Sequence, residues 1–368
     1  MNRTTRAHLN VEGQSHAGMT GKNNEDRYAV ASFVLSPTEK TPVLFAVLAD
    51  GIGGHKAGEV AAELAVNHIM ETVAKSDGRH VRRTIENAVA DASNAIAAHS
   101  SSDENMKGMG STCAISWIIG DKLHTAYVGD SRVYLIRGGR IQQLTVDHTW
   151  VQEAVEKNIL TPEAAREHPN VHVIRRYLGS PVPPEPDFRM KLFNDETDQH
   201  AENNQGMQLE PNDVLLMCSD GLTDLVWNDE ILEVIRSKPS LKEASAALIE
   251  LSNSRGGHDN ITIVLISTPA DFNVKGRKKT DWLPWILGGV AGLIFILIAA
   301  SLLTLNLVRR SSTPTFAAPT LPLPQVTSTP LPKPSLTFLA TLTIAPDNQP
   351  PLVPTLTPWP TNTVVVTP

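Results

Sequence analysis

The segment 282–308 constrains this chain more than any other feature of its sequence. It carries no ionisable side chain, and at about 1.5 Å of rise per residue a helix of this length would cross the roughly 30 Å hydrocarbon layer of a membrane. Trp282 and Trp285 stand near its start, and Arg309 and Arg310 follow its end; these residue types mark membrane interfaces. We therefore predict a single transmembrane helix over 282–308 rather than the alternative, a buried core helix.

The charges beside this segment predict its orientation. Cytoplasmic flanks of membrane spans are enriched in Lys and Arg, and the basic residues before the span outnumber those after it. They are Lys275, Arg277, Lys278 and Lys279. The opening residues "MNRTTRAHLNVEGQSH" lack the apolar core of a signal peptide. We expect a single-pass protein of the plasma membrane, with the residues before the span in the cytoplasm.

Composition divides the chain into four parts. Residues 309–368 are rich in Pro and Thr, a composition that cannot bury a core and is typical of an extended stalk. We predict a folded domain at 1–270, a basic juxtamembrane linker at 271–281, the transmembrane helix at 282–308 and a disordered, extracytoplasmic tail at 309–368. The lipid bilayer is accordingly one expected partner.

Net charge and cysteine content limit the class of the folded domain. The formal net charge of −7 argues against a nucleic-acid partner. Cys113 and Cys218 both lie in apolar runs without the spacing of a zinc site. We expect them to be buried thiols in a reducing compartment, with a disulfide between them as the less favoured alternative.

The folded domain alternates apolar runs of strand length with amphipathic segments. Strands are predicted at 26–35, 42–50, 111–119, 123–130, 132–139, 213–220 and 260–267. Helical periodicity covers 57–75, 81–99 and 240–254. Short neighbouring strands, such as 122–129 and 132–137, predict antiparallel pairing. The expected architecture is therefore α+β, with antiparallel sheets covered by helices.

Acidic residues recur at the ends of these strands. An apolar strand followed by Asp and Gly occurs at Asp50 and again at Asp220. Each acid alone is explained by a turn or a helix cap; the repetition is what indicates function. The acids at strand ends are Glu25, Asp26, Asp50, Asp130, Asp220 and Asp259.

If these strand ends converge, the carboxylates would repel one another unless cations lie between them. Oxygen ligands select Mg²⁺ or Mn²⁺ over zinc, and two such ions can activate a water toward phosphorus. The glycines after Asp50 would let backbone carbonyls approach the metals. A phosphate-binding loop is excluded because "GGHKAGE" has Ala57 where a Walker motif requires Ser or Thr directly after its Lys.

Six motifs in order resemble the bacterial branch of the PP2C-like (PPM) metal-dependent protein phosphatases. They are "GKNNEDRYAV", "VLADGIGGHKAGEVAAE", "GSTCAISWI", "AYVGDSRVYLIRGGRIQQLTVDHTWV", "LLMCSDGLTDLV" and "GGHDNITIVLI". The resemblance runs from about His16 to Ile266. It implies a sandwich of two antiparallel sheets flanked by helices, with two Mn²⁺ or Mg²⁺ ions at one end and a third ion as a further prediction.

The resemblance also implies roles for individual residues. Asp26, Asp50, Asp220 and Asp259 would be catalytic and bind metal; Glu25, the carbonyl of Gly51 and Asp130 complete the predicted metal set. Asp130 and Asp220 match the positions of a third, weaker ion. Supporting residues that orient ligands would be Ser131, Asp147, His148, Ser219 and Asn260. A water bridging two ions would attack the phosphate in line.

Two positions depart from the family pattern. An arginine usually clamps the phosphate where this chain has Gly21. Lys22 is the candidate replacement, with a charge but no bidentate fork. The residue after the Asp-Gly pair is Ile52, where eukaryotic members have a histidine proposed as general acid. His55 is the candidate for that role, and a helix-start residue is the alternative.

These expectations favour a membrane-tethered phosphatase, monomeric, acting on Ser/Thr-phosphorylated proteins. A membrane Ser/Thr kinase is the partner we expect, because tethering raises effective concentration. A regulator such as an anti-sigma-factor antagonist is another substrate hypothesis. The alternative from a different class is a catalytically silent, phosphoprotein-binding scaffold, which only Gly21 favours.

Overall fold

The central strand β4 (Pro42–Ala49) is apolar throughout because both of its faces are buried. The computed structural model describes residues 1–53 and 56–272. In β4, Leu44 and Leu48 belong to the core between two sheets, whereas Phe45 and Val47 belong to a core shared with helices. This division follows from the two-residue period of a strand, which sends successive side chains to opposite faces.

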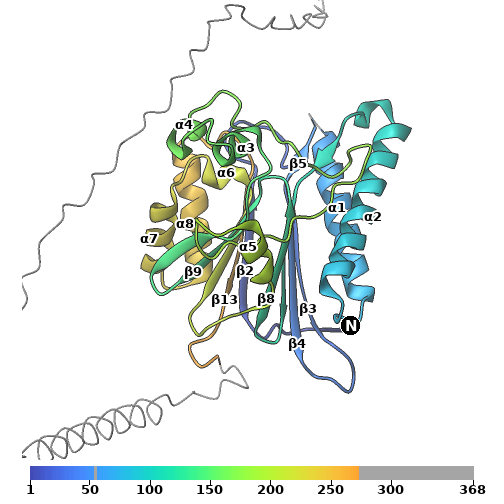
Figure 1. Ribbon diagram of the computed structural model, residues 1–368, viewed down its shortest axis with the longest axis vertical. Helices are drawn as coiled ribbons and strands as arrows, with labels where there is room; N and C mark the ends of the chain where they lie inside the picture. Colours follow the sequence, from blue (N-terminus) through green and yellow to red (C-terminus); the bar gives the residue numbers. More distant parts are fainter. Residues whose placement is uncertain (54–55, 273–368) are drawn as a thin grey trace, which may run out of the picture. The chain divides into compact units, whose positions relative to one another are not determined.

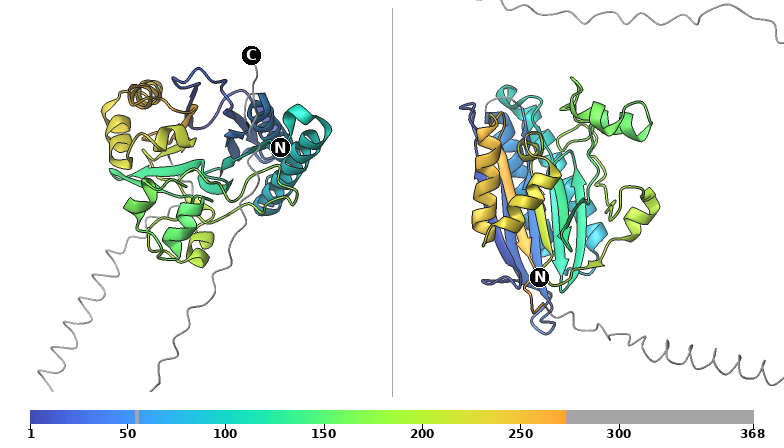
Figure 2. Two further views of the ribbon diagram at one scale, coloured as in Figure 1. Left: turned by 90° about the horizontal axis from the view of Figure 1, so that it is seen from above. Right: turned by 90° about the vertical axis from the view of Figure 1, so that its left-hand side faces the viewer.

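Two antiparallel sheets make up the body of the described residues (Figures 1 and 2). The first has the order β1-β3-β4-β7-β8-β11. Its strands besides β4 are β1 (Asn2–Thr4), β3 (Arg27–Val34), β7 (Cys113–Ile119), β8 (Lys122–Val128) and β11 (Met207–Gln208). The second has the order β10-β9-β12-β13-β2. Its strands are β2 (Asn10–His16), β9 (Arg132–Arg137), β10 (Arg140–Gln143), β12 (Val214–Cys218) and β13 (Ile261–Ser267). A separate pair joins β5 (Gly51–Ile52) to β6 (Gly110–Ser111).

Helices cover the outer face of each sheet, on opposite sides of the sandwich (Figure 1). On the first sheet, α1 (Lys56–Lys75) and α2 (Val81–Ser102) bury small residues such as Ala61, Ala65 and Ala92 against Val47. Those alanines recur at helical spacing, which creates one apolar face. On the second sheet lie α6 (Asp220–Thr223), α7 (Asn228–Ser237) and α8 (Leu241–Ser254).

The segment 150–190, which we call the flap, crosses the end of the sandwich. It contains α3 (Trp150–Glu156) and α4 (Pro162–Arg166), which begin at the capping side chains of Thr149 and Thr161. A further short helix, α5 (Asp198–Asn203), and a 3-10 turn, η1 (Glu104–Met106), complete the described elements. Isolated bridges attach the flap region to the body at Thr149↔Ile174, Ser111↔Leu178 and Tyr127↔Asp187.

The predicted α+β architecture with antiparallel sheets is confirmed, and one predicted pairing is wrong. The strands expected at 122–129 and 132–137 form, but β8 and β9 belong to different sheets. Gly129, with φ of 104°, turns the chain from the first sheet to the second. β9 instead pairs with β10. The consequence is that Asp130 lies where the two sheets meet.

Several sequence predictions fall on other parts of the chain. No helix within 1–53 and 56–272 is both long and apolar enough to span a membrane. The predicted transmembrane helix at 282–308 and the tail at 309–368 lie outside the described residues, as does nearly all of the linker at 271–281. Cys113 and Cys218 are buried free thiols, so the alternative of a disulfide between them is wrong.

Candidate metal centre

Acidic residues from both sheets gather at one edge of the sandwich. Because neighbouring strands are antiparallel, the start of β3 lies beside the end of β4, and the end of β12 lies beside the starts of β9 and β13. The acids predicted from the sequence stand at these strand ends. They are Asp26, Asp50, Asp130, Asp220 and Asp259.

Asp50 is fixed through its backbone by the start of the β7 segment. Its amide donates to Thr112 Oγ1 over 3.0 Å, and the amide of Thr112 donates back to the Asp50 carbonyl over 2.8 Å. The Ser111 hydroxyl also donates to that carbonyl. These bonds hold the backbone of Asp50 while leaving its carboxylate to the acidic edge.

Ser219 joins the second sheet to Asp26 on the first. Its hydroxyl donates to Asp26 Oδ2 over 2.7 Å and accepts from the amide of Thr262 over 3.0 Å. Ser219 is fully buried and Asp26 is 2% exposed. The bond leaves the other carboxylate oxygen of Asp26 without a donor among the described residues.

Asn260 organises the segment that leads to Asp26. Its Oδ1 accepts from the Glu25 amide over 2.7 Å, and its Nδ2 donates to the carbonyls of Ala17 and Asn23. Its own amide donates to Asp259 Oδ1. Asn260 thus joins the backbone of Glu25 to the segment of Asp259.

Three buried carboxylate oxygens at this edge have no hydrogen-bond partner among the described residues: Oδ1 of Asp26, of Asp130 and of Asp220. A buried acceptor without a donor is costly and calls for an explanation. An oxygen-only set of unpaired carboxylates fits a hard divalent cation such as Mg²⁺ or Mn²⁺. The donor chemistry at this edge therefore fits the predicted metals.

At this edge, burial and the mutual repulsion of the carboxylates outweigh the nearby positive charges of Lys22, Arg27 and Arg132. Burial raises the pKa of Asp26 to about 6 and that of Asp130 to about 7. Burial and then the neighbouring carboxylates raise the pKa values of Asp50 and Asp220 well above the ordinary range. Burial, followed by Asp259, raises the pKa of Glu25 to about 7. Bound cations would reverse these shifts.

His148 positions the turn that carries Asp130. The Gly129 amide donates to His148 Nδ1 over 3.1 Å, so the proton of the neutral ring is on Nε2, which lies 3.2 Å from Asp187 Oδ2. Arg189 forms further ion-pair contacts with Asp187. This chain of contacts fixes Gly129 and thereby the direction in which Asp130 leaves β8.

Two other predicted supporting residues, Ser131 and Asp147, have defined side-chain partners. Ser131 Oγ lies 2.8 Å from Thr112 Oγ1, so it supports Asp50 through Thr112. Asp147 accepts from Arg132 at its Nε and Nη2 atoms, with a shortest distance of 2.6 Å. Asp147 therefore pairs with a partly buried arginine.

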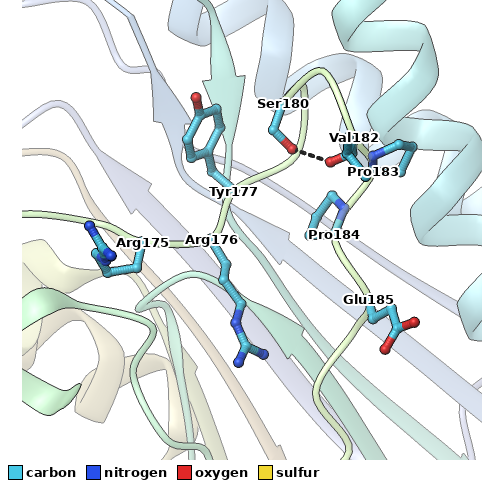
Figure 3. Close-up of a pocket in the computed structure, with 8 residues that line it drawn as sticks. All are labelled: Arg175, Arg176, Tyr177, Ser180, Val182, Pro183, Pro184 and Glu185. Carbon is cyan, nitrogen blue, oxygen red and sulfur yellow. Dashed lines mark hydrogen bonds between the residues drawn. The ribbon is translucent and has the colours of Figure 1, made fainter.

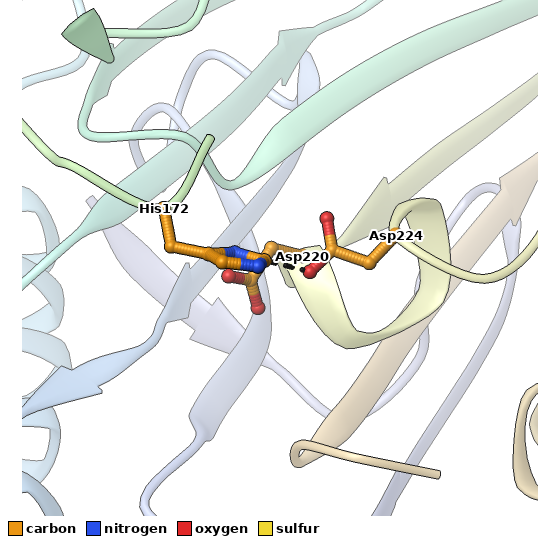
Figure 4. Close-up of side chains that lie close together, drawn as sticks. All are labelled: His172, Asp220 and Asp224. Carbon is orange, nitrogen blue, oxygen red and sulfur yellow. Dashed lines mark ion pairs between the residues drawn. The ribbon is translucent and has the colours of Figure 1, made fainter. Parts of the chain in front are cut away.

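A second set of side chains lies beside Asp220 and was missed by sequence reasoning (Figure 4). One ligand atom each of His172, Asp220 and Asp224 lies within 4.8 Å of the others, and His172 Nδ1 is 3.4 Å from Asp224 Oδ2. Asp224 follows Asp220 by four residues, a helical spacing that places two acids on one face. That spacing was the available signal for Asp224. His172 comes from the flap, and no local pattern marks it.

Glycine has a steric cause at two positions of this edge. A Cβ on Gly51 would collide with the Gly58 carbonyl oxygen and would lie 2.8 Å from that of Glu25. A Cβ on Gly221 would collide with the Asn260 carbonyl oxygen. The glycines therefore permit close approach of backbone to backbone, which holds the acids near one another.

The two residues of the predicted phosphate clamp, Gly21 and Lys22, lie in an exposed segment. Gly21 has φ of 73° and no heavy atom within 4 Å of an added Cβ, so a left-handed backbone stands where the family's arginine is expected. Lys22 is exposed, and its charge lowers the pKa of nearby Glu25 against the larger effect of burial. His55 lies outside the described residues.

A two-sheet sandwich with an acidic, oxygen-lined edge defines a metal-dependent hydrolase. Residues 12–261 match the family described as Protein phosphatase 2C. The chain belongs to this family.

Relatives of known name extend over the same part of the chain. It is 31% identical over 276 residues to the serine/threonine phosphatase stp of Listeria monocytogenes, covering 74% of this chain and 100% of that protein. The S. agalactiae serine/threonine phosphatase has a similar structure, with a TM-score of 0.61, 32% identity and coverage of 71% of this chain and 99% of that one. The catalytic domain of PstP in complex with two manganese ions has a TM-score of 0.58 and 32% identity, covering 70% and 97%.

Proposed function

We propose that the acidic edge holds two divalent ions and hydrolyses phosphoserine and phosphothreonine on protein substrates. The chain is a metal-dependent protein-serine/threonine phosphatase by its family and its named relatives. The observation that carries the assignment of the site is the set of buried, unpaired carboxylate oxygens on Asp26, Asp130 and Asp220. The alternative of a silent scaffold is not favoured, because every acid predicted for the metal set is present.

Each acid has a distinct task in this proposal. Asp50 and Asp220, whose pKa values are raised by burial and by neighbouring carboxylates, would hold the ions between the two sheets. Asp26 would face them with its free oxygen while Ser219 holds the other. Asp259 and Glu25 would complete the metal site on its solvent-exposed side. When bound, such a pair of ions lowers the pKa of a water and neutralises phosphoryl charge.

The third ion predicted from the sequence would lie beside Asp220. Asp130 contributes an unpaired oxygen, and after burial the charges of Asp130 and Asp224 contribute most to the raised pKa of Asp220. The imidazole of His172 lies against Asp224. A His172→Ala variant should need several-fold more Mn²⁺ for half-maximal activity, with unchanged melting temperature, if these residues share an ion.

The substrate phosphate would be held by Lys22, the exposed cation beside Glu25, acting as a point charge. His55 remains our candidate to protonate the leaving hydroxyl. Neither role follows from a contact within the described residues, so each is tested by substitution: Lys22→Gln should raise KM, and His55→Gln should lower kcat.

The location and partners are proposals that rest on the sequence. The segment 282–308, which has no ionisable side chain, and the basic residues that precede it support a membrane-anchored protein with its catalytic domain in the cytoplasm. A membrane Ser/Thr kinase then becomes the substrate favoured by proximity. We propose a monomer, to be checked by light scattering of the detergent-solubilised chain.

The decisive experiment uses the full chain in detergent with p-nitrophenyl phosphate and a phosphothreonine peptide. Phosphate release is followed with Mn²⁺, with Mg²⁺ and with chelator, for the natural protein, Asp220→Asn and the exposed-loop control Asp195→Asn. We expect metal-dependent turnover that Asp220→Asn abolishes and Asp195→Asn retains. If the folded protein binds Mn²⁺ but shows no turnover, the phosphoprotein-binding scaffold becomes the favoured hypothesis.

A further inference from the structure

A groove of about 380 Å³ lies in the flap (Figure 3). One wall is the segment Arg175–Tyr177, and the other is the turn from Ser180 to Glu185. The second wall is rich in proline, and the Ser180 hydroxyl donates to the Val182 carbonyl over 2.6 Å. Proline restricts φ, so this wall loses little conformational freedom when a ligand binds.

The groove is connected to the metal centre through paired backbone. Leu178 exchanges two backbone hydrogen bonds with Ser111, at 2.8 and 3.1 Å, and Ser111 pairs with Gly51. Neighbouring strands lie about 4.8 Å apart, which puts the backbone of Leu178 roughly 10 Å from Gly51. An extended polypeptide advances about 3.3 Å per residue. A substrate chain with its phosphoresidue at the metals would therefore reach the groove about three residues away.

The two arginines of the groove differ in their contacts with the rest of the protein. Arg175 has its amide bonded to the His148 carbonyl, and its Nε lies 3.6 Å from Glu153. Arg176 is exposed and has no hydrogen-bond or ion-pair partner among residues 1–53 and 56–272. Figure 3 shows its guanidinium extending on the same side as Glu185 of the opposite wall. The backbone around Arg176 is held in place by hydrogen bonds, and its guanidinium lines the groove with its donors unused by the described residues.

The chemistry of these walls selects one occupant. A guanidinium binds a carboxylate through two parallel hydrogen bonds. A phosphate, with about −1.5 to −2 charges at neutral pH, would be repelled more strongly by Glu185 than a carboxylate would. Tyr177, Pro183 and the exposed Val182 offer apolar contact to the chain that carries the carboxylate. The occupant that fits is an extended acidic segment of the substrate protein.

We propose that Arg176 is a specificity-determining residue, which binds an Asp or Glu side chain about three residues from the phosphoresidue of the substrate. This inference rests on the proposed phosphatase function and adds a substrate class to it: phosphoproteins with an acidic residue at that spacing.

The test compares phosphothreonine peptides with the full chain and Mn²⁺. Glu, Gln or phosphoserine is placed three residues before or after the phosphothreonine, in otherwise identical peptides. We expect the better-placed Glu peptide to exceed its Gln counterpart by about five- to ten-fold in kcat/KM, through KM, because hydrogen bonds to charged groups are stronger than neutral ones. The phosphoserine peptide should fall between the two.

Variants of the groove separate this inference from the phosphatase function itself. Arg176→Gln should remove the preference for Glu and leave p-nitrophenyl phosphate turnover unchanged, whereas Arg175→Gln should retain the preference. Glu185→Gln should improve the phosphoserine peptide. Equal rates with Glu and Gln, a preference that survives Arg176→Gln, or a phosphoserine peptide better than Glu would overturn the inference. Loss of all metal-dependent turnover would instead refute the function on which it rests.

Discussion

Two aspartates flank the same strand, β12 (Val214–Cys218), and their surroundings are opposite. Asp213, before the strand, is 2% exposed and accepts from Arg137 Nε at 2.8 Å and Nη2 at 2.5 Å and from the Glu210 amide at 2.6 Å. Asp220, after the strand, has a buried oxygen without a donor among the described residues and acidic neighbours in place of an arginine.

The contrast separates a carboxylate that is paired within the fold from one that we propose binds metal. A buried charge is tolerated when it is paired and hydrogen-bonded, and otherwise it is costly. The pairing at Asp213 is internal to the protein. At Asp220 the described residues offer no donor to the buried oxygen, and under the proposed function a divalent ion would take that place. Substitutions at the two ends of β12 should therefore have different consequences.

The largest effect is expected at the unpaired end. Asp220→Asn removes a carboxylate from the proposed metal set, and metal stabilisation of transition-state charge amounts to several kcal/mol. We expect kcat/KM for p-nitrophenyl phosphate to fall about a thousand-fold. The metal-free variant should melt no lower than the natural protein, because it loses a repulsive charge. A lower melting temperature in chelator would mean that Asp220 is a structural residue like Asp213.

The next effect is expected at the paired end and falls on stability. Asp213→Ala leaves Arg137, which is partly exposed, without its main partner. We expect a loss of about 2–3 kcal/mol, or roughly 5–10 °C in melting temperature, measured by circular dichroism. Activity at 25 °C should be retained. Arg137→Met with Asp213→Ala should recover part of the loss; an additive double variant would show that the pair does not act as a unit.

A smaller effect is expected where the protein supplies a single hydrogen bond to the acidic edge. Ser219→Ala removes the donor to Asp26 Oδ2. Loss of a bond that orients a metal ligand costs about 10–100-fold in affinity or activity, and we expect the lower figure for Mn²⁺ binding by calorimetry. Ser237→Ala, at an exposed helix end, is the matched control. Unchanged Mn²⁺ affinity in Ser219→Ala would remove Asp26 from the metal set.

The smallest effect concerns pH. The folded pKa values of Asp26, about 6, and Asp130, about 7, are raised above their unfolded values near 4. Such groups contribute stability below pH 4 that is lost as pH rises through 6 to 7. Mn²⁺ requires the deprotonated ligands, so its stabilising effect should grow over the same interval. Melting temperatures at pH 5, 6 and 7, with Mn²⁺ and with chelator, should diverge by a few degrees; parallel curves would contradict this.

Much of the fold followed from local pattern, and the failures have physical causes. β4 and β13 were predictable because both faces are apolar. The strand β2 (Asn10–His16) is polar and lies at a sheet edge, so neither period nor composition marks it. The pairing of 122–129 with 132–137 failed because the chain changes sheets at Gly129, a long-range outcome that strand patterns do not contain.

The acids of the site were predictable because each follows or precedes a strand, and antiparallel order brings those ends together. The groups that position them were harder to find. Thr112 acts through its hydroxyl on the Asp50 amide, and His172 reaches Asp224 from the flap. Both contacts join segments far apart in sequence. Thr112 stands in the motif "GSTCAISWI", but nothing in that motif indicates its contact with Asp50, and no motif includes His172.

The two cysteines have a consequence for oxidative stress. Cys113 and Cys218 are the only cysteines of the chain, both are fully buried, and burial raises the pKa of each thiol to about 12. Peroxide and alkylating agents react with accessible thiolates. The catalytic domain offers them no such target even though Cys218 lies two residues from Asp220. Peroxide that silences cysteine-dependent phosphatases should thus leave this one working, and any loss of activity under oxidation would have to come from groups other than its thiols.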